Sequence, residues 1–199
     1  MKALTLSVMI LFSLCVPLCL CAQQQSPNLV KNGDFEKFTG DNPDNWETSN
    51  IPGTLTVVSA TKTCFSGQHA VKCEVKDFFG SCIAGYVCQK NIPIGGRDVR
   101  LTCHYLLHSV GEDQGVIVLA FLNENGSTIG SDEEYLDETN SKFLAFAKEI
   151  KAPSGAASLN VRVTILAAKS TDKIHQGSHI ICDDLKLIAI APKEKQLLQ

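Results

Sequence analysis

Two acidic stretches near opposite ends of the chain contain the residues best suited to hold a cation. The segment 28–36 reads NLVKNGDFE and ends in the carboxylate of Glu36. The segment 179–187 reads HIICDDLKL, an apolar run with Asp183 and Asp184 in its middle. A buried carboxylate without a partner is costly, so acids inside such a run need one. A cation held jointly by Glu36 and Asp183 would supply that partner and would tie the two ends of the chain together.

Sequence patterns of known catalytic sites are missing. The chain contains no Gly-x-Ser-x-Gly, Gly-x-x-x-x-Gly-Lys, Gly-x-Gly-x-x-Gly or His-Glu-x-x-His pattern. Residues 129–138 carry five acids, which could supply the paired carboxylates of a glycosidase. A charge run of this kind is more typical of a solvated loop, so we predict a protein that is not an enzyme.

The first 22 residues are typical of a secretory signal peptide. Lys2 precedes an apolar run, and small residues precede an expected cleavage after Cys21 or Ala22. A retained membrane helix is disfavoured because Pro17 interrupts the run. We expect residues 23–191 to form one extracellular module, followed by a charged tail at 192–199. The formal net charge of -3 excludes the basic surface that nucleic acids require.

Three of the nine cysteines leave with the signal peptide, and six remain. An even number of cysteines in an exported chain favours disulfides, although sequence alone cannot assign the pairing. The easiest local pairs are Cys82 with Cys88 and Cys64 with Cys73. No Cys-x-x-Cys pair suggests zinc. The disulfide candidates are Cys64, Cys73, Cys82, Cys88, Cys103 and Cys182.

Short strands separated by turn signals account for the rest of the mature chain. Residues 159–166 alternate between apolar and polar side chains, and residues 116–122 form a continuous apolar run. We also predict an opening strand at 28–36, a solvated loop at 129–138, and a core position for Trp46. Asn125 begins a glycosylation sequon in an expected hairpin turn. This pattern, without a convincing helix, predicts an all-β fold, an antiparallel β-sandwich.

Five segments resemble, in order, those of jelly-roll carbohydrate-binding modules of the galactose-binding-like superfamily. They are 28–36, 43–46, 66–70, 89–93 and 181–187, and the resemblance extends over roughly residues 28–190. It implies a jelly roll with a structural calcium ion held by Glu36, Asp183 and the backbone carbonyl of Gln68. Calcium accepts such a mixture of carboxylate and carbonyl oxygens. The alternative is that the two carboxylates accept hydrogen bonds from neighbouring amides.

The resemblance also implies a glycan-binding surface on a concave sheet face. By position this is the face opposite Leu101, with Thr102, His104 and Leu106, joined by Tyr86 and Arg162. His104 stands where related modules often have a stacking aromatic ring. We therefore predict a secreted, non-catalytic module that recognises extracellular or cell-surface glycan. The alternative is an extracellular structural or protein-interaction domain on the same fold.

Overall fold

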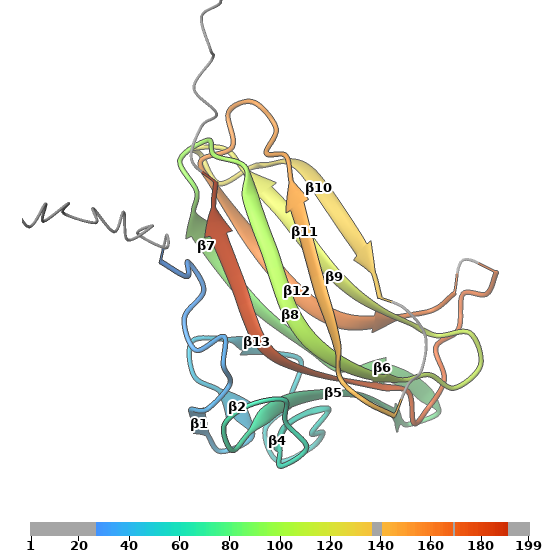
Figure 1. Ribbon diagram of the computed structural model, residues 1–199. Helices are drawn as coiled ribbons and strands as arrows, with labels where there is room; N and C mark the ends of the chain where they lie inside the picture. The colour runs from blue at the N-terminus through green and yellow to red at the C-terminus, as the bar shows by residue number, and fades with distance from the viewer. Residues whose placement is uncertain (1–26, 137–140, 169, 191–199) are drawn as a thin grey trace, which may run out of the picture.

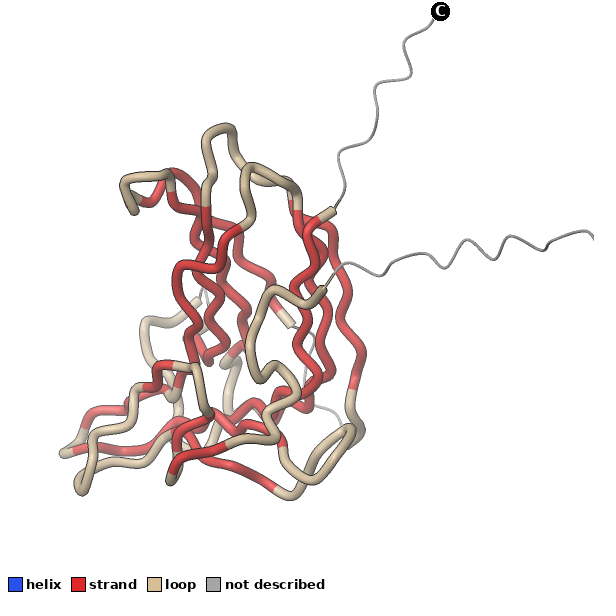
Figure 2. The backbone as a smooth tube through the Cα atoms, turned by 90° about the vertical axis from the view of Figure 1, so that its left-hand side faces the viewer, coloured by secondary structure: helices blue, strands red, loops and turns tan. Residues whose placement is uncertain are grey.

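Two antiparallel sheets pack face to face and make up most of the molecule (Figure 1). The computed structural model describes residues 27–136, 141–168 and 170–190, so the predicted signal peptide and the charged tail at 192–199 lie outside the described residues. Figure 2 shows only strands and loops in this part of the chain. None of the described residues forms a helix long and apolar enough to cross a membrane.

The strands divide between two main sheets and one small hairpin. The five-stranded sheet has the order β10-β9-β12-β7-β3, and the six-stranded sheet has the order β11-β8-β13-β5-β4, with β6 paired to β5. The strands are β1 (Phe38–Thr39), β2 (Asn42–Pro43), β3 (Glu47–Thr48), β4 (Val58–Thr61), β5 (Ala70–Phe78), β6 (Ser81–Ala84), β7 (Tyr86–Pro93), β8 (Val99–His108), β9 (Gln114–Leu122), β10 (Thr128–Tyr135), β11 (Leu144–Ile150), β12 (Ser158–Leu166) and β13 (His179–Ala189).

The core lies between the two sheets and follows the side-chain alternation of the sequence. In β12 the residues Leu159, Val161 and Val163 point inward and are completely buried, while the intervening Arg162 is exposed. A strand turns successive side chains to opposite faces, so one face of each sheet fills the core and the other faces outward. The predicted all-β antiparallel sandwich is confirmed.

The opening segment 28–36 is not a strand, contrary to the prediction. Asn32 and Phe35 have φ angles of 49° and 48°, which break an extended run. The segment instead lies beside β13, where the amide of Leu185 donates to the carbonyl of Gly33 at 2.8 Å. A Cβ at Gly33 would lie 2.1 Å from the carbonyl oxygen of Leu185, so this close approach requires glycine.

Trp46 occupies the predicted core position. Its side chain is buried beside Phe35, with the ring centroids 5.1 Å apart. The indole Nε1 donates to the carbonyl oxygens of Lys31 and Asn32 at 3.1 and 3.2 Å. Trp46 therefore fixes the turn of the opening segment against the core, and it offers no stacking platform.

The acidic stretch belongs to the edge strand β10, and the prediction of a solvated loop at 129–138 is wrong for residues 129–135. Glu134 points inward from β10, is only 7% exposed, and forms an ion pair with Lys148 of β11. The pair joins the edges of the two sheets, which explains why an acid tolerates this buried position. Charged side chains also protect an edge strand from pairing with other chains. Asp137 and Glu138 lie outside the described residues.

Candidate functional site

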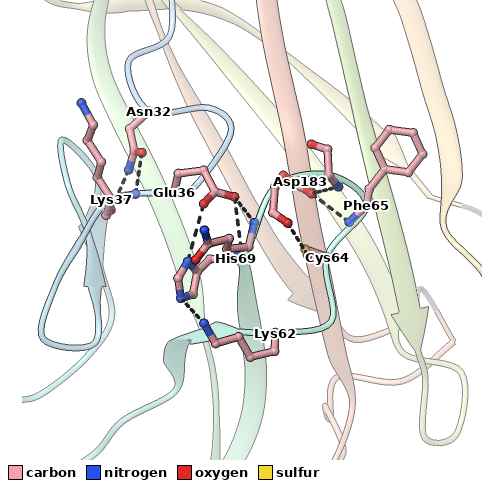
Figure 3. Close-up of polar contacts among 11 residues, drawn as sticks. Asn32, Glu36, Lys37, Lys62, Cys64, Phe65, His69 and Asp183 are labelled. Carbon is pink, nitrogen blue, oxygen red and sulfur yellow. Dashed lines mark hydrogen bonds and ion pairs between the residues drawn. The ribbon is translucent and has the colours of Figure 1, made fainter.

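Glu36 and Asp183 hold one loop, Cys64–His69, between them (Figure 3). Glu36 Oε1 accepts hydrogen bonds from the amides of Gln68 at 2.8 Å and His69 at 3.1 Å. Gly67, which directly precedes these two residues, has a φ of 68°, and a Cβ there would lie 2.0 Å from Glu36 Oε1. Only glycine leaves room for the carboxylate to reach both amides. We call this arrangement the carboxylate clamp.

Asp183 forms the other half of the carboxylate clamp and has no exposed surface. Its Oδ2 accepts hydrogen bonds from the amides of Phe65 and Ser66, both at 2.9 Å. Its Oδ1 accepts a hydrogen bond from the amide of Asp184 at 2.7 Å. Three amide donors satisfy a carboxylate that the sequence places inside an apolar strand, so the cost of burying it is offset.

The pKa values of the two carboxylates in the clamp are shifted in opposite directions. The amide hydrogen bonds from His69 and Gln68 lower the pKa of Glu36, because they favour its charged form. Burial raises the pKa of Asp183, and the amides of Ser66, Asp184 and Phe65 oppose that rise only in part. Glu36 is therefore the more stable anion of the two.

The donors around Glu36 and Asp183 do not fit the calcium site that the sequence predicts. Calcium requires six to eight oxygen ligands, whereas here five amide N–H groups point at the two carboxylates. Among the residues that the structure describes, no three His, Cys, Asp or Glu side chains are grouped to hold a metal ion. Calcium binding by Glu36, Gln68 and Asp183 stays a prediction, and the geometry favours the alternative of amide hydrogen bonds.

The residues predicted to bind glycan lie on opposite sides of the sandwich. Thr102, His104 and Leu106 are on the outer face of the six-stranded sheet, in β8. Tyr86 and Arg162 are on the outer face of the five-stranded sheet, in β7 and β12. The prediction of a single five-residue site is wrong, because alternation assigns a residue to a face of its strand without showing which sheet that strand joins.

On the six-stranded sheet, the predicted position His104 is covered. The ring of Phe65 stacks on it with centroids 3.5 Å apart and planes 5° apart, and Phe143 meets Phe65 edge-on at 6.2 Å. Asp184 Oδ2 lies 3.7 Å from His104 Nδ1. Because the carboxylate clamp fixes the amide of Phe65, it also fixes this cover over His104. The imidazole cannot present its face to a sugar.

On the five-stranded sheet, Tyr86 and Arg162 form a pair. The guanidinium carbon of Arg162 lies 4.4 Å from the centre of the Tyr86 ring, within range of a cation–π contact. Cys88 lies between Tyr86 and Lys90 on β7 and pairs across the ladder with Arg162. The residue Cys88 is 2% exposed, and burial raises the pKa of its thiol. In the sequence, the alternation of apolar and polar residues in β12 already indicated that Arg162 points outward.

Polar side chains continue this outer face toward both edges of the five-stranded sheet. On one side, Lys90 Nζ lies 2.6 Å from Glu47 Oε2 of β3. On the other, the Tyr135 hydroxyl donates to Glu133 Oε2 at 2.7 Å in β10. The sequence analysis missed all four residues. It read Glu133 as part of a loop, although its alternation with the inward Glu134 could have shown that it lies on a strand. We call the surface with Glu47, Tyr86, Lys90, Glu133, Tyr135 and Arg162 the tyrosine–arginine face.

All six predicted disulfide candidates are free thiols within the described residues, so the Cys82–Cys88 and Cys64–Cys73 pairs are not formed. Cys73 points into the core, where burial raises its pKa to about 12. Cys88 instead points to the outer face of the other sheet, and Cys64 lies in the clamped loop. Cysteines that are close in sequence are thus kept apart, because they lie on different sheets or faces, or in a loop.

The sequence matches no protein-family model and gives no significant match among curated proteins. Solved structures resemble the fold. Tailspike protein 4 of bacteriophage CBA120, an enzymatically active domain, gives a TM-score of 0.60 at 17% identity over 82% of this chain, which spans only 21% of that protein. TmCBM61, solved with β-1,4-galactotriose, gives 0.50 at 19% identity over 83% of this chain and 100% of that one. The CBM22-1 xylan-binding domain of Paenibacillus barcinonensis Xyn10C gives 0.54 at 12% identity over 85% and 98%. The chain therefore has the jelly-roll β-sandwich fold of carbohydrate-binding modules.

Proposed function

We propose that this protein is a secreted, non-catalytic module that binds extracellular or cell-surface glycan on its tyrosine–arginine face. One observation carries the proposal: Arg162 lies 4.4 Å above the Tyr86 ring in the interior of an outward sheet face. The structural neighbours TmCBM61 and CBM22-1, with their printed ligands galactotriose and xylan, support a sugar as the ligand.

The guanidinium of Arg162 covers one face of the Tyr86 ring, so the two side chains would meet a sugar as one stacked unit. A pyranose has apolar C–H faces, which can pack on the flat guanidinium or the edge of the aromatic ring, and hydroxyl edges, which accept and donate hydrogen bonds. The guanidinium of Arg162 carries five donors in a planar fork, so it can bind two neighbouring hydroxyl oxygens at once. The side chain of Arg162 is exposed, and its stacking on Tyr86 limits the freedom it would lose on binding.

The polar residues at either side extend the surface along a chain of sugar units. Glu47, Cys88, Arg162, Val118 and Glu133 stand opposite one another in a row across five strands. Neighbouring strands are about 4.8 Å apart, so the row is roughly 19 Å long, enough for several sugar units. A polysaccharide crossing the sheet along this row would meet Glu47 and Glu133 near its ends.

The same row argues against glycoside hydrolysis. Retaining and inverting glycosidases hold their two carboxyl groups about 5 to 9.5 Å apart. Glu47 and Glu133 are separated by four strand intervals, which amount to roughly 19 Å. The two acids can orient hydroxyl groups, but they are too far apart to act on one bond.

Binding to immobilised polysaccharides, followed by titration calorimetry with the best binder, tests the proposal. Arg162→Ala and Tyr86→Ala should each weaken binding at least about tenfold, a loss of about 1.4 kcal/mol. Thr102→Ala, on the outer face of the other sheet, is the matched control and should bind like the wild type. Equal losses in all three variants, or binding lost only in Thr102→Ala, would refute the tyrosine–arginine face as the site.

A second candidate function is protein interaction by the outer face of the six-stranded sheet. Phe65 is 48% exposed there, stacked on His104 and edge-on to Phe143. Exposed apolar groups of this kind are common at protein interfaces. A glycan array without a single bound sugar, together with partner binding that is lost in Phe65→Ser, would favour this alternative.

A further inference from the structure

We propose that the cross-strand pair His108 and His179 binds a divalent transition-metal ion such as Zn²⁺ or Cu²⁺. The two residues stand directly opposite each other on the neighbouring strands β8 and β13. Both belong to the outward alternation of the six-stranded sheet, in which His108 is exposed and His179 is partly buried. The site is distinct from the carboxylate clamp and from the tyrosine–arginine face.

The spacing of the two rings suits a shared ion. The ring centroids of His108 and His179 are 5.1 Å apart, and the planes are tilted by 32°. A ligating nitrogen lies about 2.0–2.1 Å from zinc, and the ring centre lies roughly 1.1 Å further out, so two imidazoles at a tetrahedral angle have centres about 5.2 Å apart. The observed distance matches this value without a movement of the strands.

The hydrogen bonding of His179 prepares its other nitrogen for a metal. His179 Nδ1 lies 3.0 Å from the carbonyl oxygen of Gly177. A carbonyl oxygen only accepts, so Nδ1 carries the hydrogen and Nε2 keeps its lone pair. Metal-binding histidines are usually held in this way, with the second ring nitrogen donating to a backbone carbonyl or a carboxylate. Burial also lowers the pKa of His179, which keeps the ring neutral and able to bind a metal.

A carboxylate stands in the same cross-strand row. Glu74 of β5 is directly opposite His179, on the side away from His108. Its oxygens now pair with Lys72 at 3.2 Å and Lys76 at 3.5 Å. Partly exposed ion pairs of this kind contribute little to stability, so Glu74 can turn toward an ion at small cost. In the part of the chain that the structure describes, no third ligand is already in place, so water and Glu74 would complete the coordination.

The ligand type selects the class of metal. Imidazole nitrogens suit zinc, copper and nickel, whereas calcium and magnesium prefer oxygen ligands. A site of two histidines with one carboxylate in reach should therefore bind Zn²⁺, Cu²⁺ or Ni²⁺ and should not bind Ca²⁺.

Isothermal titration of the purified protein with ZnCl₂ and CuCl₂ tests the inference, with the electron paramagnetic resonance spectrum of bound Cu²⁺ as a second readout. We expect one ion per chain and nitrogen hyperfine structure from two imidazoles. His108→Ala and His179→Ala should each weaken binding by about tenfold or more. Glu74→Gln should weaken it less. His104→Ala, which removes a covered histidine of the same sheet, is the matched control and should bind like the wild type.

Two results would overturn the inference. Binding that survives in the His108→Ala/His179→Ala double variant would assign the ion to another site, such as the partly exposed thiols of Cys64 and Cys82. A Cu²⁺ spectrum without nitrogen ligands would exclude the imidazoles directly. Circular dichroism of each variant identifies any that fails to fold, and titration of the intact wild type provides a test that needs no variant.

Discussion

Replacing Asp183 by Asn tests whether amide hydrogen bonds alone hold the loop 64–69. The carboxylate accepts three amide hydrogen bonds, two on Oδ2 and one on Oδ1, and it is completely buried. An asparagine has one carbonyl oxygen. If this oxygen keeps the amides of Phe65 and Ser66, the side-chain NH₂ group must face the amide of Asp184, and one donor is left without an acceptor.

The expected loss follows from these contacts. An unsatisfied buried donor costs about 1–3 kcal/mol, and the two remaining hydrogen bonds lose the strength that a charged acceptor gives them. Removing a buried charge offsets part of this loss, so we expect Asp183→Asn to destabilise the protein by about 2 kcal/mol. For a domain of this size that is a fall of roughly 4–8 °C in Tm.

Glu36→Gln is the matched control for Asp183→Asn. The amides of Gln68 and His69 both bond to Oε1, so a glutamine oxygen can keep both of them. Glu36 is also partly exposed. We therefore expect a smaller loss, below about 1 kcal/mol.

Urea unfolding of the three proteins, each in EDTA and in CaCl₂, measures these differences. A free energy of unfolding for Asp183→Asn within about 0.5 kcal/mol of the wild type would refute the amide account. A Tm that rises with Ca²⁺ in the wild type, but not in Asp183→Asn, would show instead that a calcium ion holds the loop.

Two further predictions concern the opening segment and its carboxylate. Because hydrogen bonding lowers the pKa of Glu36 in the folded state, its contribution is present above the unfolded pKa and is lost as pH falls through the folded value. The stability difference between the wild type and Glu36→Gln should therefore shrink from about pH 5 toward pH 3, and a difference that grows toward low pH would contradict this sign. Trp46→Phe keeps the contact with Phe35 but leaves the carbonyls of Lys31 and Asn32 without the indole donor, so unfolding in urea should show a loss of about 1–2 kcal/mol. An unchanged midpoint would mean that other donors replace it.

Strand periodicity correctly predicted the class of fold and many of its details. In β12 the apolar residues alternate with polar ones, which fixed the inward face from Leu159 to Ile165. The same rule placed Arg162 outward, and the core position of Trp46 was predicted separately, from its place just after a loop. These features depend on local chemistry, because a strand has a period of two and an apolar side chain is buried on one face.

Edge and turn segments were predicted less well. The acidic stretch 129–138 was expected to be a loop because charge is usually solvated, but the ion pair between Glu134 and Lys148 allows residues 129–135 to belong to a strand. The opening segment 28–36 was expected to be a strand, but Asn32 and Phe35 adopt positive φ angles. Both errors have one cause: the contacts that decide the conformation lie outside the segment itself, with Lys148 for the acidic stretch and with Leu185 for the opening segment.

By itself, the sequence determined which residues are acidic, which face of each strand is apolar, and that Glu36 and Asp183 require partners. Only the tertiary structure decided what those partners are, since four of their five amides come from the loop 64–69, which is distant from both acids in sequence, and only the amide of Asp184 is local. It also separated His104 from Tyr86 and Arg162, and it brought His108 opposite His179. The physical reason is that alternation assigns a side chain to a face of its own strand, whereas the pairing of strands decides which faces share a sheet.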